Sequence, residues 1–573
     1  MKASKPGLFP ASSDVERRFV EVDGRAIHYR VAGAGPAIVM LHDSPRSSRL
    51  HLDTMRQLSR SFRVFALDTP GYGNSQSLGK ERPEIEDFAN ALRAALDALG
   101  LTGAPLYATH TSAKIALEYA ARSPLPSRLI LDGLSIPAAP ADPGFIERYM
   151  RPFRIEGTGG YLAAEWTRTR DMVRWFPWFE QRPDTRIPVA LPDEAWTSDY
   201  VTDFFSAGPD YASAYGAAMR YNPMPALLTV ACPTLVAARA DDVLFGFLDK
   251  VPTERNPSLS VERLPAEHDA WLAWLEEAFA AGAAGTTPFT VVAPQPSHGW
   301  RYVDLTHGPL RVHRAGPEAG RPLLILSAPA TLHALRWQAS LADRPTLVPE
   351  LPGFGESAPL PHPSVTAAAD ALAEMIQTLG FAQVDLLATN FATPSAAALA
   401  ATYPDLVGRV ILDGCFDLAD DNRPGFAATL CPTFPFDRGG GHIHRYWHML
   451  RDAEASWPWH AAEADARRSL TPLLEAEGLH DALLGLLKQP SHYGDIARAS
   501  CDLPRERRYP SFGQPALLLD RPDDPAYRAT AVLAAHLPDA LIAPRASTIK
   551  QSAEAAAAFL APSPTASRKA VAS

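Results

Sequence analysis

The segment Asp68-Thr-Pro-Gly-Tyr-Gly-Asn-Ser75 returns 282 residues later as Glu350-Leu-Pro-Gly-Phe-Gly-Glu-Ser357. The run RFVEVDGRAIHYRVAG at 18–33 returns as RYVDLTHGPLRVHRAG at 301–316, with a spacing of 283 residues. A nearly constant offset over most of the chain is typical of duplicated domains, whereas solenoid repeats have much shorter periods. The sequence therefore predicts a tandem duplication of one fold. The functional question is which of the two copies has catalytic activity.

Length and composition bound the class of protein. At 573 residues the chain is too long for one core, and two domains of about 280 residues fit the usual size range. The net charge of −10 argues against nucleic acid or anionic membrane as the main partner. The four cysteines show no paired spacing, and neither a signal peptide nor a membrane-spanning apolar run is evident. We therefore expect a cytoplasmic protein that binds no membrane.

Within each copy, strand-like and helix-like patterns alternate. Continuous apolar runs at 37–41, 63–67 and 105–109 indicate buried strands, and helical spacing follows at 84–99 and 113–121. Such alternation predicts an α/β fold, in which helices cover both faces of a mostly parallel sheet.

A long insertion follows the strand that ends in an Asp-Gly pair in each copy. It is rich in tryptophan, phenylalanine, tyrosine, proline and arginine, and the family resemblance given below implies that it is a cap. A segment of small residues, threonine and proline links the copies, and the polar C-terminal tail is predicted to be disordered. In chain order, the predicted parts are a first domain at 1–284 with a cap at about 137–228, a linker at 285–296, a second domain at 297–561 with a cap at about 416–512, and a tail at 562–573.

A string of motifs gives this layout a family resemblance. Leu41-His42 ends the third strand, Pro70-Gly71-Tyr72-Gly73 follows the fourth, and a strand–turn–helix comes next. The string resembles the α/β-hydrolase superfamily, and the resemblance covers nearly all of both copies. It implies two α/β-hydrolase-like domains in tandem, each a mostly parallel sheet flanked by helices with an inserted helical cap. It also implies a hydrolase that acts on a small organic substrate.

The resemblance also locates the nucleophile position. The family usually carries Gly-x-Ser-x-Gly at a tight turn between strand and helix, where small flanking residues are needed. Alignment of 108–124 with 388–404 places His110 and Asn390 at the serine position. By this alignment, neither copy keeps the nucleophilic serine. A shift of the nucleophile to Thr111 or Ser112 is disfavoured, because the turn aims one side chain at the base.

The remaining catalytic positions distinguish the two copies. In the first copy, the resemblance places Asp242 at the acid position, with Asp241 as a weaker match, and His268 at the base position. In the second copy, Asp524 supplies an acid, but the base position falls at Ser547. We expect the first copy to be catalytic through His110, Asp242 and His268. The second copy is expected to be a degenerate domain that takes the place of a second subunit.

Four roles for His110 remain open. It acts as a nucleophile, with His268 as base and Asp242 orienting that base. Alternatively, both imidazoles transfer protons to or from water or substrate, as in an ester, thioester, lactone or C–C hydrolase or a lyase. In the third reading His110, His268 and His42 bind a metal. In the fourth, His110 is an inert core residue, and the domain is a pseudoenzyme that binds a small ligand. We favour the second, without metal or cofactor.

The segment that normally forms the oxyanion hole is altered. The family commonly has His-Gly after the third strand, and here His42-Asp43-Ser44 stands there. Backbone N–H groups near Asp43 and of Thr111 would stabilise an oxyanion, but the Asp43 carboxylate disfavours negative charge unless it is paired, for example with Arg46. This argues against ordinary esterase chemistry.

The predicted cap offers two further candidates. Trp166 and Arg170 are four residues apart, so they share one face of a helix and can bind an anionic or aromatic small molecule. The alternative is a cap core with a structural Arg-Asp pair. It is favoured because the motif returns at Trp447 and Arg451 in the degenerate copy.

Overall fold

The computed structural model describes residues 15–122, 126–283, 295–418, 423–537 and 539–561. The chain forms two compact units that divide between Pro296 and Ser297. Most of the predicted linker and the whole predicted tail lie outside the described residues. Along the described helices, none combines the length and apolar character needed to cross a membrane.

The first domain is built on an eight-stranded sheet with the order β1-β2-β4-β3-β5-β6-β7-β8. The β1–β2 and β2–β4 pairs are antiparallel, and all other pairs are parallel. The strands are β1 (Glu16–Val22), β2 (Arg25–Ala32), β3 (Ala37–Leu41), β4 (Arg63–Leu67), β5 (Leu106–Thr109), β6 (Leu129–Asp132), β7 (Thr234–Arg239) and β8 (Leu259–Leu264).

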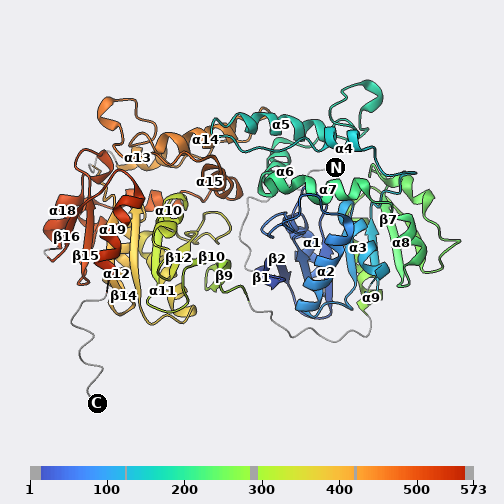
Figure 1. Ribbon diagram of the computed structural model, residues 1–573, viewed down its shortest axis with the longest axis horizontal. Helices are drawn as coiled ribbons and strands as arrows, with labels where there is room; N and C mark the ends of the chain where they lie inside the picture. The colour runs from blue at the N-terminus through green and yellow to red at the C-terminus, as the bar shows by residue number, and fades with distance from the viewer. Residues whose placement is uncertain (1–14, 123–125, 284–294, 419–422, 538, 562–573) are drawn as a thin grey trace, which may run out of the picture. The chain divides into compact units, whose positions relative to one another are not determined.

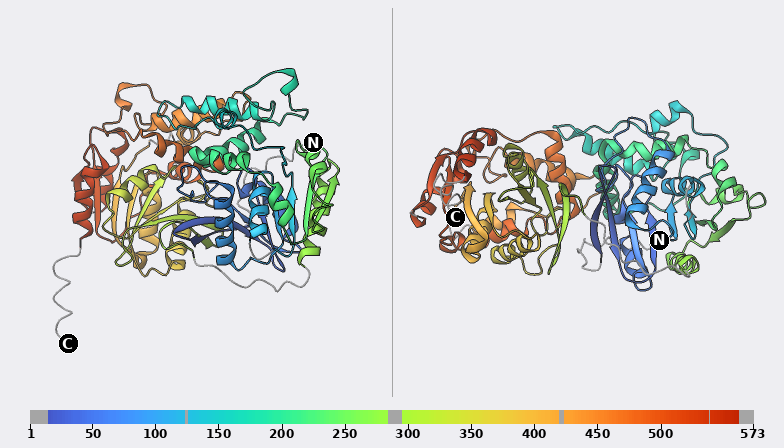
Figure 2. Two further views of the ribbon diagram at one scale, coloured as in Figure 1. Left: turned by 45° about the vertical axis from the view of Figure 1, so that its right-hand side comes forward. Right: turned by 60° about the horizontal axis from the view of Figure 1, so that its bottom comes forward.

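Helices cover both faces of this sheet (Figure 2). Apolar side chains of α1 (Leu52–Leu58) and α9 (His268–Ala283) join the strands in one buried core. The helices α2 (Ile85–Leu99) and α3 (Thr111–Arg122) contact each other (Figure 1). This layering follows from β5 and β6, whose residues are almost all buried and so need cover on both sides.

An inserted helical cap lies between β6 and β7. Figure 1 shows its helices along one end of the sheet, and α7 contacts both α2 and α3. The cap helices are α4 (Pro143–Tyr149), α5 (Gly160–Met172), α6 (Glu194–Ala207), α7 (Ala212–Arg220) and α8 (Met224–Thr229).

The second domain repeats this architecture. Its sheet order, read from the other end, is β9-β10-β12-β11-β13-β14-β15-β16, which matches the first sheet strand for strand. Its strands are β9 (Gly299–Leu305), β10 (Gly308–Ala315), β11 (Leu323–Ala328), β12 (Thr346–Pro349), β13 (Val384–Asn390), β14 (Val407–Asp413), β15 (Ala516–Asp520) and β16 (Leu541–Pro544). The predicted fold class, two α/β-hydrolase-like domains with inserted caps, is confirmed.

The helices of the second domain fall into the same two groups. Those packed on the sheet are α10 (Leu332–Ser340), α11 (Val365–Thr378), α12 (Thr393–Thr402), α18 (Thr530–His536) and α19 (Ile549–Leu560). Those of its cap are α13 (Arg423–Leu430), α14 (Gly441–Ala453), α15 (Ala476–Lys488), α16 (Asp495–Asp502) and α17 (Arg505–Arg508).

The repeated segment after β4 is a turn built around one buried carboxylate. Asp68 accepts hydrogen bonds from the backbone N–H groups of Ser48 (2.6 Å) and Asn74 (2.9 Å) and pairs with His28 Nδ1 at 2.7 Å. A Cβ atom on Gly73 would lie 2.2 Å from Asp68 Oδ2, so this position requires glycine. The motif therefore recurs because the turn needs its acid and its glycine together.

Four charged side chains tie the first cap to the sheet. Arg46 and Arg49 follow β3, and Asp199 and Asp203 lie one turn apart on α6. Arg46 donates to Asp203 (2.8 Å) and Asp199 (2.6 Å), and Arg49 donates to Asp203 (2.7 Å) and also pairs with Asp199. Each carboxylate therefore bridges both guanidinium groups, a geometry that fixes α6 over the end of β3.

Candidate active site

His110 occupies a strained turn between β5 and α3. Its φ angle is 49°, in the left-handed region that residues other than glycine rarely adopt. Asn390 lies at the corresponding end of β13, with a φ angle of 47°. The His110 backbone N–H donates to the Asp132 carbonyl at 3.0 Å, which fixes the turn against β6. Such strain persists where the surrounding structure over-determines the backbone, and it often marks functional sites.

Asp242 holds the His110 ring. His110 Nε2 lies 2.9 Å from Asp242 Oδ2, and the Leu244 backbone N–H donates to Asp242 Oδ1 at 2.7 Å. Gly133, which follows β6, makes room for this pair, because a Cβ atom there would lie 2.5 Å from His110 Cδ2. Three neighbouring strands therefore meet at their carboxyl ends to place one histidine, one acid and one glycine.

The pair is an imidazolium and a carboxylate at neutral pH. Burial lowers the pKa of His110, but the hydrogen bond and charge of Asp242, with the charges of Asp43 and Asp132, raise it to about 9. Burial raises the pKa of Asp242, and His110 more than offsets this, so the pKa of the carboxyl is lowered overall. The His110 side chain is 36% exposed, so its ring can still meet a ligand.

His268 lies apart from this pair, which differs from the arrangement we expected. It is the first residue of α9, is exposed, and stacks on Trp271 with 5.2 Å between ring centroids. No hydrogen bond joins it to Asp242 in the described part of the chain. Asp242 therefore orients His110 instead of His268.

Asp132 is a buried acid beside the site that sequence reasoning did not single out. It accepts hydrogen bonds from the Tyr107 hydroxyl and from the Trp271 indole, both at 2.8 Å. Burial raises the pKa of its carboxyl. Its position at the end of β6, directly before Gly133, could have indicated from the sequence that Asp132 lies near the site.

His42, which one reading of the sequence placed in a metal site, has a structural role. The Thr69 backbone N–H donates to His42 Nε2 at 2.9 Å, so that nitrogen carries no proton. Nδ1 therefore donates to the Asp43 carbonyl at 2.8 Å. Because both nitrogens are engaged and the ring is buried, His42 holds the end of β3 in place and has no lone pair left for a metal.

The side chain of Asp43 is left without the partner that we expected. Arg46 is taken by the two carboxylates of α6, and Asp43 Oδ1 is buried with no hydrogen-bond partner among the residues that the structure describes. Its charge contributes to the raised pKa of His110, so it lies near that ring. The neighbouring Ser44 is buried and hydrogen-bonds the Tyr72 hydroxyl.

The start of α3 supplies backbone donors beside His110. Thr111 and Ser112 open the helix, so their N–H groups belong to the first turn, which has no intrahelical acceptors. The Ser112 hydroxyl donates to the Thr109 carbonyl at 2.9 Å and accepts from the Thr109 N–H at 3.1 Å. Ser112 is also fully buried, so it is not a displaced nucleophile.

The cap residues Trp166 and Arg170 both lie on α5. Trp166 is buried and Arg170 is half-buried, next to Asp171. The arginine that α5 directs inward is Arg168, which donates to the Tyr211 hydroxyl at 2.8 Å and pairs with Glu165 at 2.6 Å. The i,i+3 spacing of that pair was the signal in the sequence.

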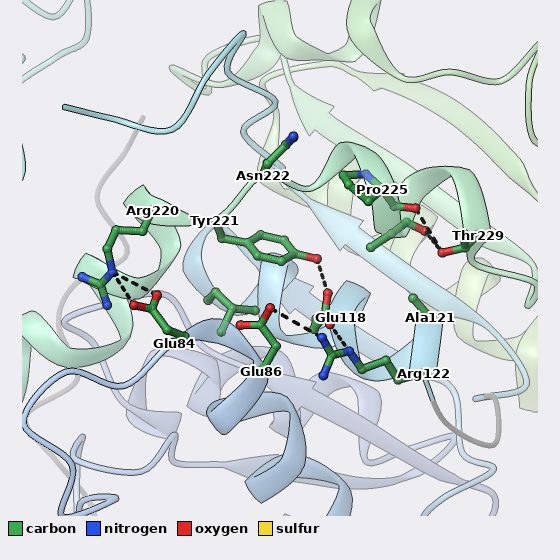
Figure 3. Close-up of a pocket in the computed structure, with 12 residues that line it drawn as sticks. Glu84, Glu86, Glu118, Ala121, Arg122, Arg220, Tyr221, Asn222, Pro225 and Thr229 are labelled. Atoms are coloured by element: carbon green, nitrogen blue, oxygen red, sulfur yellow. Dashed lines mark hydrogen bonds and ion pairs between the residues drawn. The ribbon is translucent and has the colours of Figure 1, made fainter. Parts of the chain in front are cut away.

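A separate cavity of about 520 Å³ lies at the far end of α3. Figure 3 shows Tyr221 pointing toward Glu118, whose carboxylate also pairs with Arg122, while Arg220 pairs with Glu84. Arg122 ends α3 whereas His110 precedes it, which separates them by roughly 18 Å along the helix. The cavity is therefore distinct from the His110 site, and its ionic groups are paired with one another.

The corresponding place in the second domain is arranged differently. Asn390 has no titratable side chain, and Asp524 is buried in an ion pair with Arg468 at 3.0 Å. Ser547 lies near Gln551 on the surface. Phe391, the residue after Asn390, stacks on Trp457 with 4.9 Å between centroids. Among the residues that the structure describes, no acid–histidine pair hydrogen-bonds to Asn390.

Comparison with known proteins gives a matching family and relatives that cover part of the chain. The model of the alpha/beta hydrolase fold family matches residues 36–247 and 330–450, more than half of the chain. A haloalkane dehalogenase of Agrobacterium fabrum is 31% identical over 168 residues, which cover 28% of this chain and 53% of that protein. The bifunctional epoxide hydrolase 2 of Rattus norvegicus is 38% identical over 84 residues, 14% of each chain. The chain thus spans about half of that dehalogenase and less of the epoxide hydrolase.

Two of the solved structures to which the chain is similar are an esterase and an epoxide hydrolase. An esterase from Thermogutta terrifontis is 20% identical, with 46% of this chain and 97% of that chain covered and a TM-score of 0.34. Epoxide hydrolase VrEH1 from Vigna radiata is 20% identical, with 46% and 96% covered and a TM-score of 0.36.

Proposed function

Because the chain belongs to the α/β hydrolase fold family, we propose that its first domain is a hydrolase in which His110, held by Asp242, transfers protons to a small organic substrate. The observation that carries the proposal is the 2.9 Å contact between His110 Nε2 and Asp242 at the strained turn. In this proposal His110 stands where the family carries its nucleophile, and water attacks the substrate directly.

The charge state of the pair supports one of the roles that the sequence left open. A nucleophilic imidazole must be neutral, whereas a pKa of about 9 keeps His110 protonated at neutral pH. Nδ1, the ring nitrogen that Asp242 does not hold, has no hydrogen-bond partner among the described residues. An imidazolium with one anchored and one available N–H is suited to general acid catalysis.

The proposed reaction is a direct hydrolysis in which His110 donates one proton and takes one back. Water adds to the electrophilic carbon while His110 Nδ1 gives its proton to the departing oxygen, sulfur or carbon, and the bond to that leaving group breaks. The neutral imidazole then takes up the proton that the attacking water releases, which restores the imidazolium. Asp242 stays ionised throughout and keeps the ring in place. Proton donation also suits a site in which Asp43 opposes a developing oxyanion.

The relatives extend the set of substrates to be tested. Esters, thioesters, lactones and β-diketones follow from the fold, and epoxides are included because one relative is named an epoxide hydrolase. Opening an epoxide leaves an alkoxide, which an imidazolium can protonate. The second domain is proposed to be non-catalytic, an intrachain counterpart of a second subunit, because Asp524 is held by Arg468.

Turnover of this substrate panel by purified variants tests the proposal. His110→Asn installs the residue that the second domain carries at the same turn, and Asn390→Gly alters the turn of the second domain. We expect His110→Asn and Asp242→Asn to lower kcat/KM by about 100-fold or more, the usual contribution of general acid catalysis. Asn390→Gly should keep full activity.

The variant His268→Ala tests whether His268 acts as the catalytic base, as the sequence predicted. The proposal requires activity to be retained, since His268 stacks on Trp271 away from Asp242. Activity that survives His110→Asn would overturn the proposal. A protein that binds panel compounds but turns none of them over would support the alternative, a ligand-binding pseudoenzyme.

A further inference from the structure

The second domain contains an aromatic stack directly above its strained turn. Phe391 follows Asn390, and its ring lies nearly parallel to that of Trp457, with an interplanar angle of 24° and 4.9 Å between centroids. Phe416, two residues after Gly414, adds a third ring at 5.1 Å from Phe391. The side of the turn that faces its cap is thus filled by the protein's own rings.

The first cap preserves the framework of this stack. The bridge between Trp175 and Arg186 matches the bridge between Ser456 and Arg467, 281 residues later. This register makes Phe176 the counterpart of Trp457. The side-chain contacts agree, since Phe145 packs on Phe176 at 6.1 Å and Phe426 packs on Trp457 at 6.0 Å.

The anchoring of the two cap loops also agrees. The Trp178 indole donates to the Tyr149 carbonyl at 3.0 Å. The Trp459 indole donates to the Leu430 carbonyl, also at 3.0 Å. Both residue pairs are offset by 281, so the loop that carries Phe176 is held as the loop of Trp457 is.

The rings that complete the stack are missing from the first domain. Thr111 stands at the position of Phe391, and Ser135 at that of Phe416. Phe176 is 55% exposed, and its ring contacts with Phe145 and Tyr149 are tilted by 53°, so neither is a parallel stack. A flat aromatic face therefore remains uncovered in the cap, on the loop whose counterpart covers the turn.

We propose that the first domain takes substrates with an aromatic ring, which stacks on Phe176 in the place that Phe391 fills in the second domain. The ring would lie beside Thr111, with the bond to be cleaved near His110. This inference rests on the proposed site at His110, but it concerns binding and does not require turnover. Stacked aromatic pairs contribute about 0.5–1.5 kcal/mol beyond area burial, equivalent to a preference of roughly 2- to 12-fold.

The test compares benzamide with cyclohexanecarboxamide, which have the same polar group and differ in the ring. Their dissociation constants for the full chain are measured by ligand-observed NMR. We expect benzamide to bind roughly 2- to 12-fold more tightly. In Phe176→Leu this preference should disappear. Val189→Ala, an exposed apolar change on the same cap loop, should leave it intact.

Thr111→Phe installs the second domain's own ring and should abolish benzamide binding while the protein stays folded, as judged by its Tm. Equal binding of both amides, or no binding of either, would overturn the proposal. So would a preference that persists in Phe176→Leu, a variant whose exposed position leaves the fold intact. Because His110→Asn should still bind benzamide, loss of catalysis and loss of the aromatic site are distinguishable.

Discussion

The pH dependence of turnover depends on one imidazole. If His110 acts as an acid, kcat/KM should fall as the pH rises through its raised pKa of about 9. Asp242→Asn removes the charge that raises this pKa and leaves only a neutral amide as hydrogen-bond partner, so the residual activity should fall away at lower pH. A pH–rate profile of both proteins measures this. A wild-type profile that stays flat through that pKa would contradict general acid catalysis by His110.

A second prediction concerns the substitution of Gly133, the glycine beside the His110 ring. A methyl group there would meet His110 at 2.5 Å, and the φ angle of 68° is itself unfavourable for alanine. Gly133→Ala should displace the ring from Asp242, lower kcat/KM and destabilise the fold by about 1–3 kcal/mol. Activity assays and urea denaturation check this. The matched control is Gly103→Ala, where a Cβ atom meets nothing within 4 Å. Equal effects of the two changes would refute the steric argument.

From the sequence, Asp242 was predicted to orient His268, but in the structure it contacts His110. Order along the chain and family resemblance place an acid, a histidine and a turn near one sheet edge. They do not say which side chain the acid reaches. That depends on where α9 begins, because His268 opens the helix and its ring turns toward Trp271. Asp43 was anticipated as an unfavourable charge, but its lack of a partner followed from α6 taking Arg46.

Among the elements, α6 depends most on a long-range contact. Asp203 is buried and accepts from both Arg46 and Arg49. Burial raises the pKa of Asp203, but the two guanidinium groups lower it overall, so it is ionised at neutral pH. Asp203→Asn leaves two buried cations with one carboxylate, and we expect a loss of about 3–5 kcal/mol.

Chemical denaturation of Asp203→Asn measures this loss. The control is Asp53→Asn, because the pair of Asp53 with Arg56 is exposed and should contribute at most about 1 kcal/mol. A similar small effect for both variants would show that the cluster does not hold the cap. The strands around this cluster were predictable from apolar runs. The cluster itself was not, because the two arginines and two carboxylates lie about 150 residues apart in the sequence.

At the scale of the whole molecule, the duplication was the most predictable feature. A constant offset implies the same strand order in both halves, and the two sheets have it. Each domain also has its own buried core, which joins strands to the first and last helices of that domain. The constant sequence spacing between the copies does not reveal which side chains differ at matched positions. Phe391 has an aromatic ring, which covers the turn of the second domain. Thr111, at the matching position of the first domain, has none.

The left-handed turn of the first domain carries an acid–histidine pair, and the matching turn at Asn390 has the same backbone conformation. In the described part of the chain no acid–histidine pair hydrogen-bonds to Asn390, yet its φ angle of 47° is within two degrees of that of His110. Gly414 has likewise been kept next to it, since a Cβ atom there would lie 2.7 Å from Asn390 Oδ1. The unfavourable backbone is therefore a property of the scaffold that both domains share, and it does not depend on an acid–histidine pair. A left-handed elbow alone is thus no evidence of activity in either domain.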